Sequence, residues 1–283
     1  MTRRIALAVA TVLVMAAPSF AGVVYSAKTT GEGAKGAEAQ SSTVRAWVSE
    51  GNAKVLFEAS QNPMTESGSY LITKDGGQTI YLVNPEDKTY AKWDLEAMMQ
   101  LATGAMKMVN LKITDPKVEK LAEGLGVPIL GVPTTHYKFR TSYGMQMKFF
   151  GMSQSNTIVQ DEEIWAAPSL LDAGFGIWLR KTPPKSGDKD FDALMKSEMQ
   201  KMTGFPLKRI TVTTTTDKKG KQETTRTTME VTELKMQPIP GSTFEIPADY
   251  KETELVPTGE GEEGQQGSEN PLAGLFGKKK KSG

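Results

Sequence analysis

Alternation of apolar and polar residues with a period of two is the feature that most restricts how this chain can fold. The stretch 43–48 alternates Val or Ala with Thr, Arg or Trp, and 135–143 alternates aromatic residues or Thr with polar and basic ones. Successive side chains of a strand point to opposite faces, so both stretches predict half-buried strands. Turn sequences at 50–52, 74–77 and 84–87 separate the early runs, which predicts consecutive hairpins.

Extending this pattern along the chain predicts antiparallel strands over 23–93, 135–165 and 207–234. Helical spacing of apolar residues predicts three helices instead. They are expected near 94–103, 115–123 and 188–202. Asp94 and the Asp115-Pro116 pair carry the residue types preferred at a helix N-terminus.

The first 21 residues have the pattern of a secretory signal peptide. Two arginines precede an apolar run, and small residues precede an expected cleavage site after Ala21. The run of about thirteen apolar residues is too short to cross a bilayer core of ~30 Å. The sequence therefore predicts an exported protein, periplasmic or extracellular, without a transmembrane anchor.

The rest of the chain is expected to form one domain over 22–256 and a disordered Gly- and Glu-rich tail over 257–283. Cysteine is absent, so the domain must be held together without disulfides. The 34 basic and 33 acidic residues nearly cancel, which argues against nucleic acid as a partner. The tail could make weak contact with a membrane surface through Lys278, Lys279, Lys280 and Lys281.

Residues for metal, cofactor or nucleophilic chemistry are scarce, and the sequence predicts no catalytic, cofactor or metal site. His136 is the only histidine, and we expect it to be exposed and structural. The stretch 31–36 fits a dinucleotide fingerprint, but strand-like sequence follows it where a helix is required, which predicts a hairpin loop. The acidic run 161–163 is expected at a solvated turn or strand end.

Methionine is unusually frequent, with fifteen residues, and its flexible thioether suits an adaptable apolar surface. We predict that large apolar residues on two helices line a ligand cavity, with a packed core as the alternative. These candidates are Met98, Met99, Met106, Phe191, Met195 and Met199.

A closing segment near the end of the domain carries a resemblance to a known family. It matches the pattern P-x-x-x-F-x-x-P-x-x-Y at Pro240, Phe244, Pro247 and Tyr250. This ending is typical of an exported family called domain of unknown function 4412, within the LolA/LolB-like envelope proteins, which the chain resembles over 22–251. The resemblance implies an α+β fold: a curved antiparallel half-barrel with helices covering its concave face and closing a hydrophobic cavity. Members with known roles carry acyl chains of lipoproteins across the periplasm.

Together, the residues and the resemblance predict an exported, non-enzymatic protein that binds a lipid or another apolar ligand in a hydrophobic cavity. Two alternatives stay open at this point. One is an envelope interaction protein with a filled core, and the other is a hydrolase that works without histidine.

Overall fold

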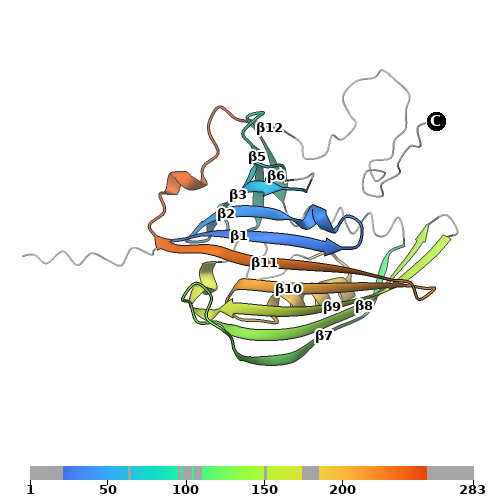
Figure 1. The fold of residues 1–283 in the computed structure, drawn as a ribbon. Coiled ribbons are helices and arrows are strands. Elements are labelled where there is room, and N and C mark those ends of the chain that lie inside the picture. The colour runs from blue at the N-terminus through green and yellow to red at the C-terminus, as the bar shows by residue number, and fades with distance from the viewer. Residues whose placement is uncertain are drawn as a thin grey trace, which may run out of the picture. The chain divides into compact units, whose positions relative to one another are not determined.

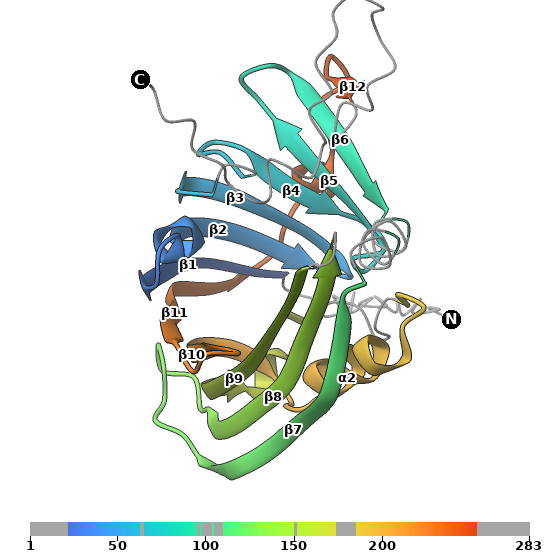
Figure 2. The same cartoon turned by 90° about the vertical axis from the view of Figure 1, so that its right-hand side faces the viewer.

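The computed structural model describes residues 22–62, 65–94, 97, 104, 110–149, 152–173 and 185–253. The chain divides into two units, Met1–Thr253 and Glu254–Gly283, and every described residue lies in the first. The predicted signal peptide and the predicted tail with its four lysines lie outside the described residues. The strands form one open, curved sheet in the order β12-β6-β5-β4-β3-β2-β1-β11-β10-β9-β8-β7 (Figures 1 and 2).

Apart from β12, the sheet consists of two antiparallel meanders. The first strand of one meander, β1, pairs with the last strand of the other, β11, at the centre of the sheet. The predicted strand regions 23–93, 135–165 and 207–234 are confirmed. The first meander contains β1 (Gly22–Gly33), β2 (Ser42–Ser49), β3 (Asn52–Ser60), β4 (Tyr70–Thr73), β5 (Thr79–Asn84) and β6 (Thr89–Asp94). The second contains β7 (Lys112–Leu125), β8 (Thr135–Phe149), β9 (Met152–Ala167), β10 (Phe205–Asp217) and β11 (Gln222–Gln237).

The helix predicted over 115–123 is wrong, because this segment belongs to the edge strand β7. Asp115 has a φ of 51°, and the register with β8 shifts between Thr114 and Lys117. The Asp-Pro pair that resembles a helix start therefore forms a β-bulge, a position where an edge strand tolerates proline. Long-range pairing with β8 overrides the local helix signal.

The helix predicted over 188–202 is confirmed as α2 (Lys189–Gln200). The side chain of Asp188 caps it by accepting hydrogen bonds from the backbone N–H groups of Asp190 and Phe191. Near its C-terminus, Glu198 accepts a hydrogen bond of 2.6 Å from Thr141 of β8. The helix also packs against β7 and, within the described residues, it is the only complete α-helix.

Most of the helix predicted over 94–103 lies outside the described residues. Ala97 and Gly104 are helical, and the backbone N–H of Ala97 donates to Asp94 at 3.0 Å. This contact agrees with the predicted capping role of Asp94. Covering of the concave face by several helices stays a prediction.

The two faces of the sheet carry different apolar clusters. On the inner face, β1, β2, β3 and β11 contribute a cluster that includes Tyr25, Val48, Val55 and Val231. On the outer face of β4 and β5, a second cluster is built from Tyr70, Ile72, Val83 and Phe244. The period-two alternation determines which cluster a residue joins, because consecutive side chains of a strand point to opposite faces of the sheet.

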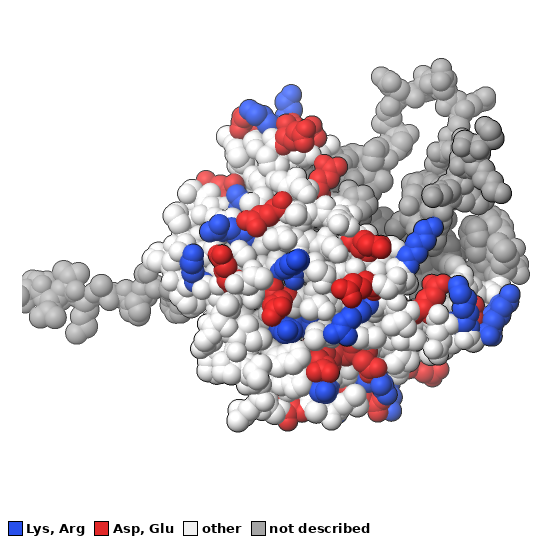
Figure 3. Space-filling view, viewed as in Figure 1, with Lys and Arg blue, Asp and Glu red and all other residues white. Residues whose placement is uncertain are grey.

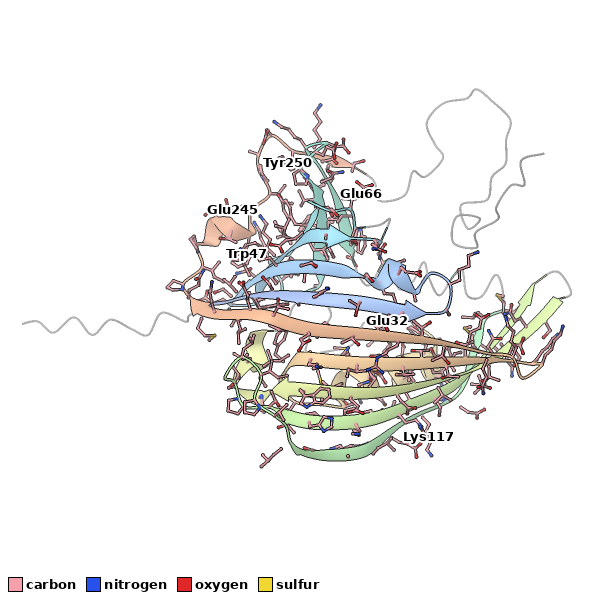
Figure 4. All side chains as sticks on the ribbon, viewed as in Figure 1. Glu32, Trp47, Glu66, Lys117, Glu245 and Tyr250 are labelled. Carbon is pink, nitrogen blue, oxygen red and sulfur yellow. The ribbon has the colours of Figure 1, made fainter. Side chains whose placement is uncertain are left out.

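The closing segment lies over the outer face of the first meander. It includes the 3₁₀ turn η4 (Gly241–Phe244) and β12 (Lys251–Thr253), which pairs in parallel with β6. Phe244 is only 3% exposed, and Ile246 and Tyr250 pack against the same cluster. Figure 4 shows Trp47, Glu245 and Tyr250 on the side of the molecule that this segment covers. We call residues 238–250 the strap.

No helix within the described part of the chain has the length and apolar character required to cross a membrane. On the face seen in Figure 3, acidic and basic side chains are interspersed, as expected from the near balance of charges.

Candidate functional site

An open cleft of about 660 Å³ lies on the inner face of the sheet. Side chains from six neighbouring strands, β3 through β9 in sheet order, line it, so this face is the concave one. The volume lies within the range of roughly 300–1,000 Å³ typical of small-molecule sites. We call this feature the inner-face cleft. Its described lining includes Tyr25, Ala27, Thr29, Val44, Val55, Phe57, Phe205, Arg209, Met229 and Val231.

One end of the inner-face cleft is apolar. The rings of Tyr25 and Phe205 approach to 5.0 Å between centroids, and Ala27, Val55 and Val231 are buried beside them. Burial also raises the pKa of the Tyr25 phenol above its ordinary range. None of these five residues is charged. This end of the cleft therefore presents aliphatic and aromatic side chains to a ligand.

The other end of the inner-face cleft carries hydroxyl and amide groups. Thr211 pairs with Thr227 and Thr213 with Thr225 across β10 and β11, so all four hydroxyls lie on the inner face. Gln40 accepts a hydrogen bond from Thr227 and also lines the cleft. The cleft thus runs from an apolar end to an uncharged polar end along the direction of β10.

A buried ionic cluster joins the floor of the cleft to α2. Lys201, the C-cap residue directly after α2, donates to Glu162 of β9 and, at 2.5 Å, to Glu198. The side chains of Glu162 and Lys201 are each only 3% exposed. Buried charges persist only when they are paired and hydrogen-bonded, so this cluster fixes the end of α2 to the sheet.

Arg209 lies on the cleft side of the ionic cluster, with its Nε 3.9 Å from Glu162 Oε1. Burial lowers the pKa of its guanidinium, and the carboxylates of Glu162 and Glu198 act in the opposite direction. Thr211 Oγ1 lies 3.4 Å from the same Glu162 oxygen. The middle of the cleft therefore contains the carboxylate of Glu162 and the guanidinium of Arg209, whose opposite charges partly offset each other.

The expectation that the acidic run 161–163 lies at a solvated turn or strand end is wrong. The run occupies the interior of β9, and alternation divides it between the two faces. Glu162 points inward, whereas Asp161 pairs with Arg140 and Glu163 pairs with Lys138 on the outer face. Burial opposes ionisation of Glu163, but hydrogen bonds from Lys138 and His136 lower its pKa overall.

His136 lies on the outer face with Lys138 and Arg140, as predicted, although it is half-buried and not fully exposed. Its ring stacks on Trp165 at 4.4 Å, and its Nε2 lies 3.2 Å from Glu163. Within the described residues, no group of three or more His, Cys, Asp or Glu side chains is placed to hold a metal ion.

The stretch 31–36 forms the end of β1 and the loop after it, as the hairpin-loop prediction expected. Only a four-residue 3₁₀ turn, η1 (Ala37–Gln40), follows. A β-carbon at Gly31 would overlap the carbonyl oxygen of Ala37, so this glycine is explained by close backbone packing.

The structure describes only three of the six predicted cavity residues. Met98, Met99 and Met106 lie outside the described residues. Phe191, Met195 and Met199 are half-buried on α2, and the described lining of the inner-face cleft does not include them. Their role in ligand binding stays a prediction.

Sequence reasoning did not select the residues that line the inner-face cleft. The sequence alone indicates that Tyr25, Ala27 and Thr29 share one face of β1, because side chains alternate along a strand. The sequence does not show that β11 lies beside β1, and this pairing brings Met229 and Val231 onto the same surface.

A family model described as "Domain of unknown function (DUF4412)" matches residues 48–250. The match covers more than half of the chain. The chain belongs to this family. The matched region of this DUF4412 protein begins in β2 and ends at Tyr250, so it includes the strap and the four strap residues of the closing pattern. No curated protein sequence matches the chain.

Proposed function

We propose that this DUF4412 protein is an exported, non-enzymatic protein that binds a lipid or another apolar molecule in the inner-face cleft. The observation that carries the proposal is the apolar end of that cleft, which Tyr25, Phe205 and Val231 line on the concave face of the sheet. The proposed helical cover consists of α2 and the predicted helix over 94–103.

The gradient within the cleft supports an amphiphilic ligand. An alkyl chain would contact the apolar end, and a polar group would meet the hydroxyls of Thr211, Thr213, Thr225 and Thr227. Unpaired polar groups are costly to bury, whereas threonine hydroxyls can both donate and accept hydrogen bonds. The cleft therefore has suitable partners for both ends of a lipid-like molecule.

The ionic cluster favours a binding role over hydrolysis. General acid or base catalysis requires a carboxyl group that can exchange a proton with the substrate. Glu162 lies at the cleft, but Lys201 binds it and Arg209 lies beside it. We infer that this carboxylate serves to hold α2. The export part of the proposal depends on the signal-like sequence over 1–21.

Uptake of a fluorescent acyl-chain or naphthyl-type probe tests the binding proposal. Thr29 lines the inner-face cleft, and Thr30, its neighbour on β1, points to the outer face. We expect Thr29→Trp to occupy the cleft and reduce probe affinity roughly tenfold or more, because it displaces several buried methylene groups of the probe.

Thr30→Trp is the matched control, since it introduces the same side chain one residue away on the opposite face. It should bind the probe as the parent does. Equal loss in both variants, or no uptake by the parent protein, would favour the alternative of an interaction protein with a filled core.

A further inference from the structure

The loop that joins β7 to β8 presents an exposed apolar surface. From Leu125 to Thr135 the sequence is Leu-Gly-Val-Pro-Ile-Leu-Gly-Val-Pro-Thr-Thr, without a single charge. Leu125 is fully exposed, Val127 is 66% exposed and Leu130 is 49% exposed. Water-facing aliphatic side chains gathered in one short loop indicate a contact with an apolar partner.

The turn at the tip of this loop is strained in a way that exposes leucine. Ile129 and Val132 exchange backbone hydrogen bonds of 3.0 and 2.9 Å around Leu130 and Gly131. Leu130 has a φ of 50° and Gly131 a φ of 77°, the pattern of a type I′ turn. Asparagine or glycine is preferred at the first of these positions, and leucine is disfavoured by its β-carbon. Strain retained at such a position points to a function for the side chain.

An aromatic and basic group lies at the base of the loop. Trp165 stacks on His136, and Lys208 Nζ lies 5.8 Å from the centre of the Trp165 ring. A β-carbon at Gly126 would be 3.1 Å from Trp165 Cδ1, so the loop begins directly against this tryptophan. Tryptophan and lysine behind an aliphatic tip are typical of the interface between water and a lipid bilayer.

We propose that the β7–β8 loop docks on a phospholipid membrane by inserting Leu125, Val127 and Leu130. A protein partner fits less well, because specific interfaces use roughly 20–30 residues on each side and this tip offers only a few. The exposed side chains of Leu125, Val127 and Leu130 offer no hydrogen-bonding group to a protein partner, whereas lipid tails require none.

The position of the loop adds to this argument. Ile129 and Val132 pack against the inner-face cluster that contains Tyr25, Phe205 and Val231. Membrane contact would therefore bring the apolar end of the cleft close to the bilayer. The docking itself goes beyond the proposed function, because it requires no ligand in the cleft.

Flotation of the full chain with phosphatidylcholine vesicles tests the proposal. These vesicles carry no net charge, and salt at about 0.5 M further screens any attraction between the tail lysines and the headgroup phosphates. We expect the parent protein to bind, and Leu130→Asn to lower its partitioning roughly tenfold or more through lost apolar insertion. Because asparagine tolerates positive φ, the same change should leave the melting temperature unchanged or raise it by about 2–4 °C. Leu125→Thr should weaken vesicle binding in the same way.

Leu121→Thr is the matched control, because Leu121 is also exposed, at 54%, but lies on β7 outside the loop. It should alter vesicle binding less than twofold. The proposal is overturned if the parent does not float with vesicles, or if Leu121→Thr and Leu130→Asn have the same effect. Probe uptake without vesicles should be normal in Leu130→Asn. Failure of the parent to take up probe while it still floats would contradict only the proposed function.

Discussion

The two flanks of the sheet bury their aromatic residues on opposite faces. In the first meander, Tyr70, Ile72 and Val83 point outward and are covered by the strap through Phe244. In the second, Tyr137, Phe139 and Ile164 point inward, and Met202 beyond α2 packs against them. Each flank therefore has its own cover, one outside and one inside. The inner face of the central strands, which carries both a buried apolar cluster and the cleft, lies between these two covered flanks.

Within the second meander, the ion pairs differ between the two faces of the sheet. On the outer face of the second meander, Glu163 and Asp161 bind Lys138 and Arg140 in place of an apolar cover. Such exposed pairs each contribute only about 0–1 kcal/mol. The Lys201–Glu162 pair is instead buried beneath the end of α2. The strap covers its flank by apolar packing, whereas the end of α2 is held to its flank by a buried ionic cluster beside the apolar contact of Met202.

The largest expected effect comes from removing the anchor of the strap. Phe244→Ala should cost about 4 kcal/mol in the free energy of unfolding, because it leaves a cavity in the outer-face cluster. Urea denaturation measures this cost. Hydrogen exchange should accelerate in β4–β6 and change little in β8 and β9. Equal acceleration in both flanks would show that they are not covered separately.

The next effect concerns the ionic cluster. Lys201→Met should cost about 3 kcal/mol, because it leaves Glu162 buried without its closest cation. The double variant Lys201→Met with Glu162→Leu should recover most of that stability, since no charge is then left unpaired. Urea denaturation of the single and double variants provides the comparison. A double variant as unstable as the single one would mean that shape, not charge, holds α2.

The smallest effect is a pH dependence in the first meander. Asp75 accepts hydrogen bonds from the backbone N–H groups of Gln78 and Thr79 and from Thr73 Oγ1. Although its partial burial acts in the opposite direction, these bonds lower the pKa of Asp75 below its ordinary value of 3.8. The contribution of Asp75 to the free energy of unfolding is therefore complete well above pH 3.8 and is lost as the pH falls below that value.

Because Asp75 is exposed, solvent screening limits this contribution to about 1 kcal/mol. Asp75→Asn should remove it, so thermal melts of the parent and the variant should differ at pH 6 and converge towards pH 3 (roughly the window expected from linkage). A difference that persists unchanged at low pH would contradict the assignment.

The strands and α2 could be predicted because their signals are local. Alternation identifies 135–143 as a strand, and Asp188 marks the start of α2. The failure at β7 has a specific cause, because an Asp-Pro pair suits both a helix N-terminus and a bulge on an edge strand. Only the pairing with β8 decides between the two.

A cavity on the concave face of the sheet was expected from the sequence, but the residues that line the inner-face cleft were not. Its lining depends on the order of strands, which places Phe57 of β3 and Gln160 of β9 around one space. The burial of Glu162 depends on Lys201, which lies 39 residues further along the chain. Neither contact has a local signature. Methionine content pointed to an adaptable surface on helices, whereas Met229 is the methionine among the described residues of the cleft.

Native mass spectrometry of the protein purified from its own host tests the central claim most directly. We predict a population with the added mass of a lipid or similar apolar molecule. That population should be lost in Thr29→Trp, which fills the inner-face cleft, and retained in Thr30→Trp on the outer face. A parent protein that carries no added mass, or an adduct that survives equally in both variants, would contradict the account.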